Sequence, residues 1–493
     1  MSVFRTKSIE QSIRDTEEPG HQLKKNLGAL DLVVFGLGVS IGAGIFVLTG
    51  QAAAANGGPA IAISFLIAGI VAGLSAICYA ELASSVPVAG SAYTFSFATL
   101  GELVAFVIGW DLVLEFTVGA AALATSFSQY LGVVLEGTPF GIPPAVASVE
   151  TGVMNLPAGL LIVGLTIILS TGIKLSSRIN QVVTAIKVIV VLLVIIVGMF
   201  YINVANWTPF VPPAEGTVGS DAGALDVPLV ETIFGLEPTV YGWGGVFAAA
   251  SLVFFAFIGF DVVATTAEET RNPQRDMPIG ILGSLAIVTV LYMAVSLVVT
   301  GVQSYEDIDP ADGAPLATAF TSVGVEWMGN LVAIGACIGL IVVSMILLLG
   351  QTRVGFAMSR DRLLPAGLGK VHSRFGTPYR FTILAGSVIA VVATFVPLST
   401  LAELVNIGTL FAFLLVALGV IILRRTRPDL PRSFRVPFVP VLPILAIAAC
   451  LFLMLNLTGG TWLRFFVWMI IGLVVYFLYS RHHSVLATGQ GGE

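Results

Sequence analysis

The sequence predicts an all-α integral membrane protein with twelve transmembrane helices. Of its 493 residues, 56% are hydrophobic and only 11% are charged, a balance far outside the range of soluble domains. Apolar windows of about 20 residues, each long enough to cross roughly 30 Å of hydrocarbon, recur along the chain. The expected spans cover residues 31–55, 60–84, 103–132, 156–174, 182–204, 244–267, 278–302, 329–356, 381–397, 400–423, 438–457 and 462–480.

The basic residues predict how these spans are oriented. All but two of the 23 lysines and arginines fall on one side of the membrane if twelve spans are counted. The exceptions are Lys187, within the fifth span, and Arg464. Because basic residues accumulate in cytoplasmic loops, we expect both termini in the cytoplasm. The polar leader, residues 1–28, contains no apolar segment that resembles a secretory signal.

Histidine and cysteine usage argues against several kinds of site. The four histidines fall in the tails or in a cytoplasmic loop, so neither a metal site nor a histidine-based active site is expected within the membrane. All three cysteines fall inside expected spans, so no disulfide framework is expected. Nor do we expect an enzyme activity, catalytic residues, a cofactor or a nucleic-acid partner.

The first span is interrupted by glycine. Gly36, Gly38, Gly42 and Gly44 fall within nine residues, and each costs roughly 1 kcal/mol against alanine in a helix interior. We therefore expect this helix to unwind. Unwound backbone at membrane depth is tolerated only where it faces a protein-lined cavity, which indicates a binding site. The alternative is close helix packing through small residues.

The sixth span carries a matching interruption. The segment Phe254–Asp261 places a carboxylate directly after a glycine. Two interrupted helices five spans apart predict an inverted repeat of five helices plus five, with the first and sixth helices holding a site at the midplane. The expected units are a cytoplasmic segment, two repeats, two further helices and a cytoplasmic tail, at 1–28, 29–204, 244–423, 438–480 and 481–493.

The two interruptions offer one site for each pole of an α-amino acid. Exposed N–H groups at the start of a half-helix attract a carboxylate. We expect those groups at Ser40, Ile41, Gly42, Ala43 and Gly44. Free carbonyl oxygens accept hydrogen bonds from an ammonium group. We expect those at Phe254, Phe255, Ala256 and Ile258.

Four ionisable residues fall within apolar spans and are functional candidates for that reason. Lys187 could snorkel to water, or it could be a buried ammonium whose neutral form is favoured by burial, so that it takes up and releases a proton. Asp261, beside the second interruption, is expected to act in binding and proton coupling. Asp111 and Glu115 share one helix face; either could bond to other helices, or Glu115 could line the substrate cavity.

Several segments carry familiar motifs. They are Gly42–Gly50, Tyr79–Ala83, Pro87–Tyr93, Phe254–Asp276 and Gly350–Asp361. Together they resemble the amino acid–polyamine–organocation superfamily, and most closely its cationic-amino-acid-transporter-type permeases. The likeness runs from about residue 24 to residue 480.

The resemblance implies a leucine-transporter-type fold and alternating access between outward-open and inward-open states. It places a substrate carboxylate at the Gly42–Gly44 turn and Lys187 where sodium-coupled relatives hold an ion, near Gly38 and Ser344. Asp261 stands where some relatives carry a proton-sensing carboxylate.

The expected function is proton-coupled symport of an L-amino acid by a multi-pass protein of the plasma (cell) membrane. The alternatives are amino acid/polyamine exchange, a nutrient sensor or a channel. No external cysteine offers a disulfide link to a heavy-chain subunit. The expected partners are therefore the amino acid, protons and the lipid bilayer.

Overall fold

A computed structural model of the chain describes residues 26–85, 91–149, 152–172, 177–216, 223, 225–236, 239–264, 266–373, 375–430 and 432–488. Within them the chain is helical apart from loops and one two-stranded antiparallel sheet, β1 (Glu215–Gly216) with β2 (Thr239–Val240). Most of the expected cytoplasmic leader, residues 1–25, and the end of the expected tail, residues 489–493, lie outside the described residues. The prediction of an all-helical membrane protein is confirmed.

Helix covers each of the expected spans. The elements there are α2 (Ala29–Ser40), η1 (Gly44–Leu48), α3 (Thr49–Ala52), η2 (Ala53–Gly57), α4 (Ile61–Ser85), α6 (Glu102–Leu135), α8 (Leu156–Ser170), α9 (Ser177–Gly198), α11 (Gly242–Val253), η5 (Phe254–Phe257), α12 (Phe260–Ala264), α13 (Pro273–Val302), α15 (Glu326–Arg360), α16 (Tyr379–Phe395), α17 (Leu398–Thr426), α18 (Val441–Leu455), α19 (Gly459–Val475) and η8 (Tyr476–Ser480).

Eight helical runs among the described residues are long and apolar enough to cross a bilayer, and four shorter apolar helices accompany them. The shorter ones are α2, which ends at the first interruption, and α8, α16 and α18, which have 15 to 17 residues. The number of twelve spans therefore stays a prediction.

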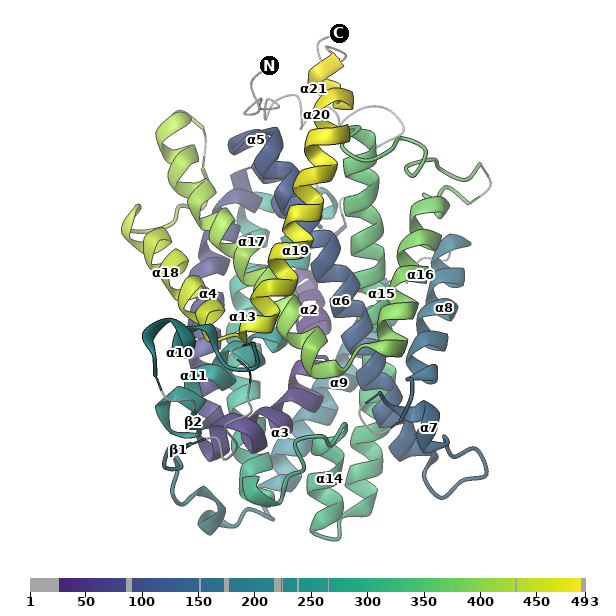
Figure 1. Cartoon of the computed structure of the whole chain (residues 1–493), viewed down its shortest axis with the longest axis vertical. Helices are drawn as coiled ribbons and strands as arrows, with labels where there is room; N and C mark the ends of the chain where they lie inside the picture. Colours follow the sequence, from purple (N-terminus) through teal and green to yellow (C-terminus); the bar gives the residue numbers. More distant parts are fainter. Residues whose placement is uncertain are drawn as a thin grey trace.

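Short helices outside these spans cover the two ends of the bundle. They are η3 (Gly58–Ala60), α5 (Ser91–Thr99), α7 (Pro144–Ala147), η4 (Val204–Trp207), α10 (Leu229–Phe234), η6 (Ala267–Glu269), η7 (Tyr305–Asp307), α14 (Pro315–Ser322), α20 (Arg481–His483) and α21 (Val485–Thr488). In Figure 1, α5, α20 and α21 lie at the top and α14 and β1 at the bottom.

The start of α8 shows how local side chains set the end of a helix. At the start of α8, for example, the Asn155 side chain accepts a hydrogen bond of 3.2 Å from the Ala158 N–H, and Pro157 occupies the first turn. The helix itself is apolar all round, and its outward residues Leu160 and Ile167 are both 60% exposed. Such a helix is stable only where its outer face meets lipid.

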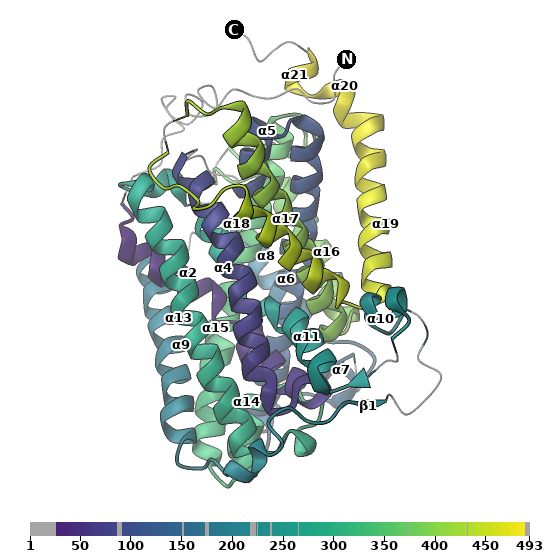
Figure 2. The same ribbon diagram turned by 90° about the vertical axis from the view of Figure 1, so that its left-hand side faces the viewer.

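Helices distant in sequence pack in pairs. α4 packs against α13, α6 against α15, and α8 against α16, while η1 meets η5. Figure 1 shows α8 and α16 side by side. In each case the partner comes five expected spans later in the chain. α18 lies at one edge of Figure 1 and α19 at one edge of Figure 2, so the last two helices flank this paired core.

Candidate functional site

The first interruption is shorter than the sequence suggests. α2 stays helical through Ser40, and only Ile41, with extended φ and ψ of −72° and 93°, and Gly42 leave the helix. The expectation that the whole run from Gly36 unwinds is wrong. A methyl group at Gly36 would lie 2.6 Å from Ser284 Cβ, and one at Gly38 would overlap the Thr184 hydroxyl. These two glycines therefore serve close helix packing.

The second interruption follows a tight turn of helix. α11 passes into the 3-10 turn η5, and Ile258 is then extended with φ and ψ of −64° and 131°. Gly259 has a φ of +132°, a conformation that side chains rarely adopt, and α12 begins directly after it. The Asp261 Oδ1 atom accepts a hydrogen bond of 3.0 Å from the Gly259 N–H. Asp261 thus holds the backbone of this turn in place.

The two interruptions lie against each other. A methyl group at Gly44 would be 2.7 Å from the Ala256 backbone nitrogen, and one at Gly259 would be 3.0 Å from the Ser40 nitrogen. Only glycine permits this approach of backbone to backbone. The non-helical backbone of both interruptions is thereby brought together, and it is buried.

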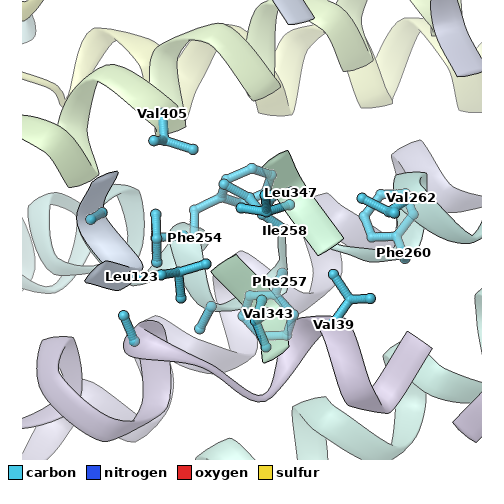
Figure 3. Packing of buried hydrophobic residues seen from close by; sticks show 14 of the residues in the cluster. Val39, Leu123, Phe254, Phe257, Ile258, Phe260, Val262, Val343, Leu347 and Val405 are labelled. Carbon is cyan, nitrogen blue, oxygen red and sulfur yellow. The ribbon is translucent and has the colours of Figure 1, made fainter. Parts of the chain in front are cut away.

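A small cavity lies beside this contact. Its lining comes from α2, η1, α6, η5, α15 and α17 and comprises Val39, Ser40, Gly42, Ala43, Gly44, Glu115, Phe116, Gly119, Leu123, Phe255, Ile258, Val343, Leu347 and Val405. Figure 3 shows Leu123, Val343, Leu347 and Val405 packed near Ile258. Backbone of the two interruptions forms the polar part of the wall, and most of the rest is apolar.

Seven of the predicted site residues line this cavity: Ser40, Gly42, Ala43, Gly44, Glu115, Phe255 and Ile258. Phe254 and Ala256 do not. The Phe254 ring packs edge to face against Phe413 at 6.0 Å, and Ala256 packs against Gly44. Ile41, Asp261 and Lys187 also lie outside the lining. Ile41 is part of the first interruption and is bonded by Lys187, and Asp261 bonds the second interruption.

Lys187 on α9 is fully buried and donates hydrogen bonds to the first interruption. Its ammonium group bonds the carbonyl oxygen of Gly38 and, at 3.0 Å, that of Ile41. Gly339 on α15 leaves room for the lysine stem, since a methyl group there would lie 2.8 Å from Lys187 Cγ. Gly38 is the expected partner. Ile41 takes the place expected for Ser344, whose hydroxyl has no hydrogen-bond partner among the described residues.

Two carboxyl groups on α6 are buried without a partner. Asp111 is 0% and Glu115 1% exposed, and none of their four oxygens accepts a hydrogen bond from the described residues. The nearby Thr409 hydroxyl donates instead to the Val405 carbonyl, at 3.0 Å. A buried carboxyl group without a partner is costly, so Glu115, which lines the cavity, is available to a ligand.

Three polar side chains that hold the interruptions were not predicted. Tyr292 donates to the Ser40 carbonyl and Tyr130 to the Phe46 carbonyl, both at 2.6 Å. Asn406 donates to the carbonyls of Ser251 and Leu252, both at 2.9 Å. The available signal was a lone tyrosine or asparagine in an apolar span.

The arrangement is suited to binding a small molecule. Among the described residues, no group of three or more His, Cys, Asp or Glu side chains could hold a metal ion. Backbone groups of two broken helices, one free carboxyl and an apolar wall enclose a space for a small molecule with a charged and an apolar part.

Comparison with known proteins gives a consistent result. Residues 27–479 match the sequence profile of a family described as amino acid permease. The chain is 46% identical to the branched-chain amino acid permease BcaP and 44% identical to the methylthioribose transporter, both of Bacillus subtilis, over 98% of this chain and 99% of each relative. It is 40% identical to the vacuolar cationic amino acid transporter 2 of Arabidopsis thaliana, over 88% of this chain and 65% of that protein.

Proposed function

The chain belongs to the amino acid permease family, and from that premise we propose that it carries an L-amino acid across the membrane by proton-coupled symport. The observation that carries the proposal is the position of Lys187. Its fully buried ammonium group bonds the Gly38 carbonyl in the last turn of α2 and the Ile41 carbonyl at the interruption beside the cavity. A titratable group is thus in direct contact with the backbone that would bind the substrate.

The substrate's charged ends find complementary groups in the cavity. The carboxylate lies at the N–H groups of Gly42, Ala43 and Gly44, where the second half of the broken helix begins. The ammonium group lies between the backbone of Phe255 and Ile258 and the free carboxyl of Glu115. Both poles are therefore held by α2, η1, η5 and one side chain of α6.

Proton coupling follows from the charge of Lys187. As an ammonium ion, Lys187 ties α2 to α9 through the Gly38 and Ile41 carbonyls. After losing its proton it donates more weakly, because hydrogen bonds from a charged donor are roughly twice as strong as neutral ones. The end of α2 then moves away from α9, and the carboxylate site opens towards the cytoplasm.

The architecture proposed for this transport is a five-plus-five inverted repeat with two additional helices. The repeats are residues 29–204 and 244–423, followed by 438–480. The packing of α4 with α13, α6 with α15, and α8 with α16 supports this division, since each pair joins corresponding helices of the two repeats. Both termini are proposed to face the cytoplasm of a plasma-membrane protein that acts without a disulfide-linked subunit.

The experiment is uptake of a panel of labelled amino acids into sodium-free proteoliposomes, with and without an inward proton gradient. Accumulation driven by the gradient supports symport and identifies the substrate. Uptake only into vesicles preloaded with amino acid would contradict symport and make the protein an exchanger, and unitary currents would make it a channel.

A further inference from the structure

The chain remains in contact with the bundle after its last expected span. Beyond η8 it forms the two short helices α20 and α21, which lie at the same end of the molecule as α5 (Figure 1). Ser480 and Ser484, four residues apart, are both 0% exposed, whereas His482 and His483 between them are exposed. Residues 480–488, here called the C-terminal segment, are therefore held through one face.

A buried carboxylate at the start of α6 receives the C-terminal segment. The Ser484 hydroxyl donates to Glu102 Oε2 at 2.9 Å, and the Tyr476 hydroxyl in η8 donates to Oε1 of the same residue at 3.3 Å. Glu102 is 1% exposed. Ser484 Oγ also accepts a hydrogen bond of 3.1 Å from the Ala487 N–H, so the same hydroxyl caps α21. One side chain thus links the fold of the segment to its attachment.

The end of α15 is the second attachment, and it leads to α5. The Val485 N–H donates to the Asp361 carbonyl at 3.2 Å. The Ser480 hydroxyl donates to the Leu363 carbonyl at 2.6 Å. The Asp361 side chain accepts at Oδ2 from the Tyr93 hydroxyl on α5, at 2.7 Å. Asp361 therefore contacts the C-terminal segment with its backbone and α5 with its carboxylate.

The position of α5 connects these attachments to the cavity. α5 packs against α6 and α17, which both line the cavity, and against α12, which follows the second interruption. Opening of the cavity at this end of the bundle requires these helices to separate, and α5 must then release at least one of them. An α5 that is fixed to Asp361 opposes that movement.

We propose that the C-terminal segment is an autoinhibitory latch, which keeps the cavity closed at this end of the bundle by holding α5 through Asp361 and the start of α6 through Glu102. The inference rests on the proposed function, since the latch restrains the opening of the transport cavity. When Ser484 leaves Glu102, α21 loses its cap, Val485 is drawn away from Asp361, and α5 is freed. The cavity then opens to the cytoplasm more often.

Full-length Ser484→Glu tests the attachment, because it places a second carboxylate beside Glu102 and like charges repel. His482→Glu is the matched control, since it adds a glutamate at an exposed position two residues away. Hydrogen–deuterium exchange reports the release. The C-terminal segment and α5 exchange faster in Ser484→Glu than in the control. Adding Glu102→Gln to Ser484→Glu restores protection, which shows that charge repulsion and not misfolding releases the segment.

Opening of the cavity is measured separately, on a residue that lines it. In protein lacking the three native cysteines, Ser40→Cys reports access to the cavity. An impermeant thiol reagent is added to inverted membrane vesicles, so that it arrives from the cytoplasmic side. Modification is about 10-fold faster or more with Ser484→Glu than with His482→Glu, since a hydrogen bond to a charged group shifts an equilibrium by roughly 10- to 100-fold. Ser484→Ala, which removes the bond and adds no charge, changes the rate in the same direction.

Two results would overturn the latch. One is equal exchange of the C-terminal segment in Ser484→Glu and His482→Glu, because the contact with Glu102 would then not hold it. The other is a released segment with an unchanged rate of modification at Ser40→Cys, because the contact would then only anchor the end of the chain. Neither measurement uses a substrate. Failure of the proposed function is therefore a separate result, seen as wild-type protein that takes up no amino acid or that ignores the proton gradient.

Discussion

The Tyr130 hydroxyl on α6 donates a hydrogen bond of 2.6 Å to the carbonyl oxygen of Phe46 in η1. The two rings also meet edge to face, with centroids 6.0 Å apart and planes inclined at 75°. Both side chains are fully buried. Because Phe46 comes two residues after Gly44, which lines the cavity, this contact fixes the second half of the broken helix against α6.

Removing this hydrogen bond should loosen the contact between η1 and α6, so that the cavity beside η1 opens more often. A buried hydrogen bond contributes about 1 kcal/mol, so Tyr130→Phe should increase the population of molecules open on that side about fivefold. The measurement is the rate at which an impermeant thiol reagent modifies a cysteine at Leu123, a cavity residue, in protein lacking the three native cysteines. Equal rates with tyrosine and phenylalanine at position 130 would contradict the assigned role.

The second prediction concerns the ammonium group of Lys187 and its role in proton coupling. In Lys187→Ala no group can take up a proton at the Gly38 and Ile41 carbonyls, so acceleration of uptake by an inward proton gradient should be abolished. Exchange of internal for external amino acid should persist, because the cavity lining is intact. Lys370→Ala, an exposed lysine in the link after α15, is the control. Undiminished gradient-driven uptake in Lys187→Ala would exclude Lys187 as the coupling residue.

Asp261 combines a structural contact with a free oxygen, and two substitutions separate them. Its Oδ1 atom accepts from Gly259 N–H, while Oδ2 has no partner among the described residues. Asp261→Asn retains an acceptor for Gly259 and should preserve melting temperature while altering the pH profile of uptake. Asp261→Ala removes the acceptor and should cost about 1 kcal/mol in stability as well. If the pH profile of uptake in Asp261→Asn were identical to that of wild type, Asp261 would have no role in proton coupling. Its role would then be limited to the hydrogen bond with Gly259.

The positions of the helices could be predicted from sequence because crossing hydrocarbon requires a long apolar run, a local property. The glycine run shows the limit of local information. Gly36 and Gly38 looked equivalent to Gly42, yet they stay helical because Ser284 and Thr184, which are far away in sequence, pack against them. Nothing within the first span distinguishes a glycine that unwinds from a glycine that packs.

The candidate site shows the same limit. Its backbone groups could be predicted, since both interruptions are local. The apolar part of the lining could not be predicted. It comes from α6, α15 and α17, and which face of each helix points inward depends on how the three helices rotate against one another. The same holds for Tyr130 and Tyr292, which are single polar residues in apolar spans whose partners lie on another helix.

A buried ion cluster should dominate stability at the end of the bundle that contains α5. Glu81 on α4 is 0% exposed and binds the Arg424 guanidinium through two hydrogen bonds of 2.8 and 2.7 Å. It also pairs with Arg432 at 3.2 Å and accepts from Val436 N–H. Glu81→Gln leaves these arginines without their countercharge and should cost about 3 kcal/mol or more. A melting temperature equal to that of Glu136→Gln, an exposed control, would contradict this.

A substitution at Glu115 tests whether this residue binds the ammonium group of every substrate or only the side chain of a basic one. If its free carboxyl receives the substrate's ammonium group, Glu115→Gln should weaken every amino acid substrate by roughly 10- to 100-fold, because a hydrogen bond to a charged group contributes about 1.5–3 kcal/mol. Competition by the same panel of amino acids measures this. If weakening were confined to lysine and arginine, Glu115 would serve a basic side chain instead of the ammonium group. Uniform weakening supports the assignment of Glu115 to the ammonium group, because that group is common to all substrates and the side chain is not.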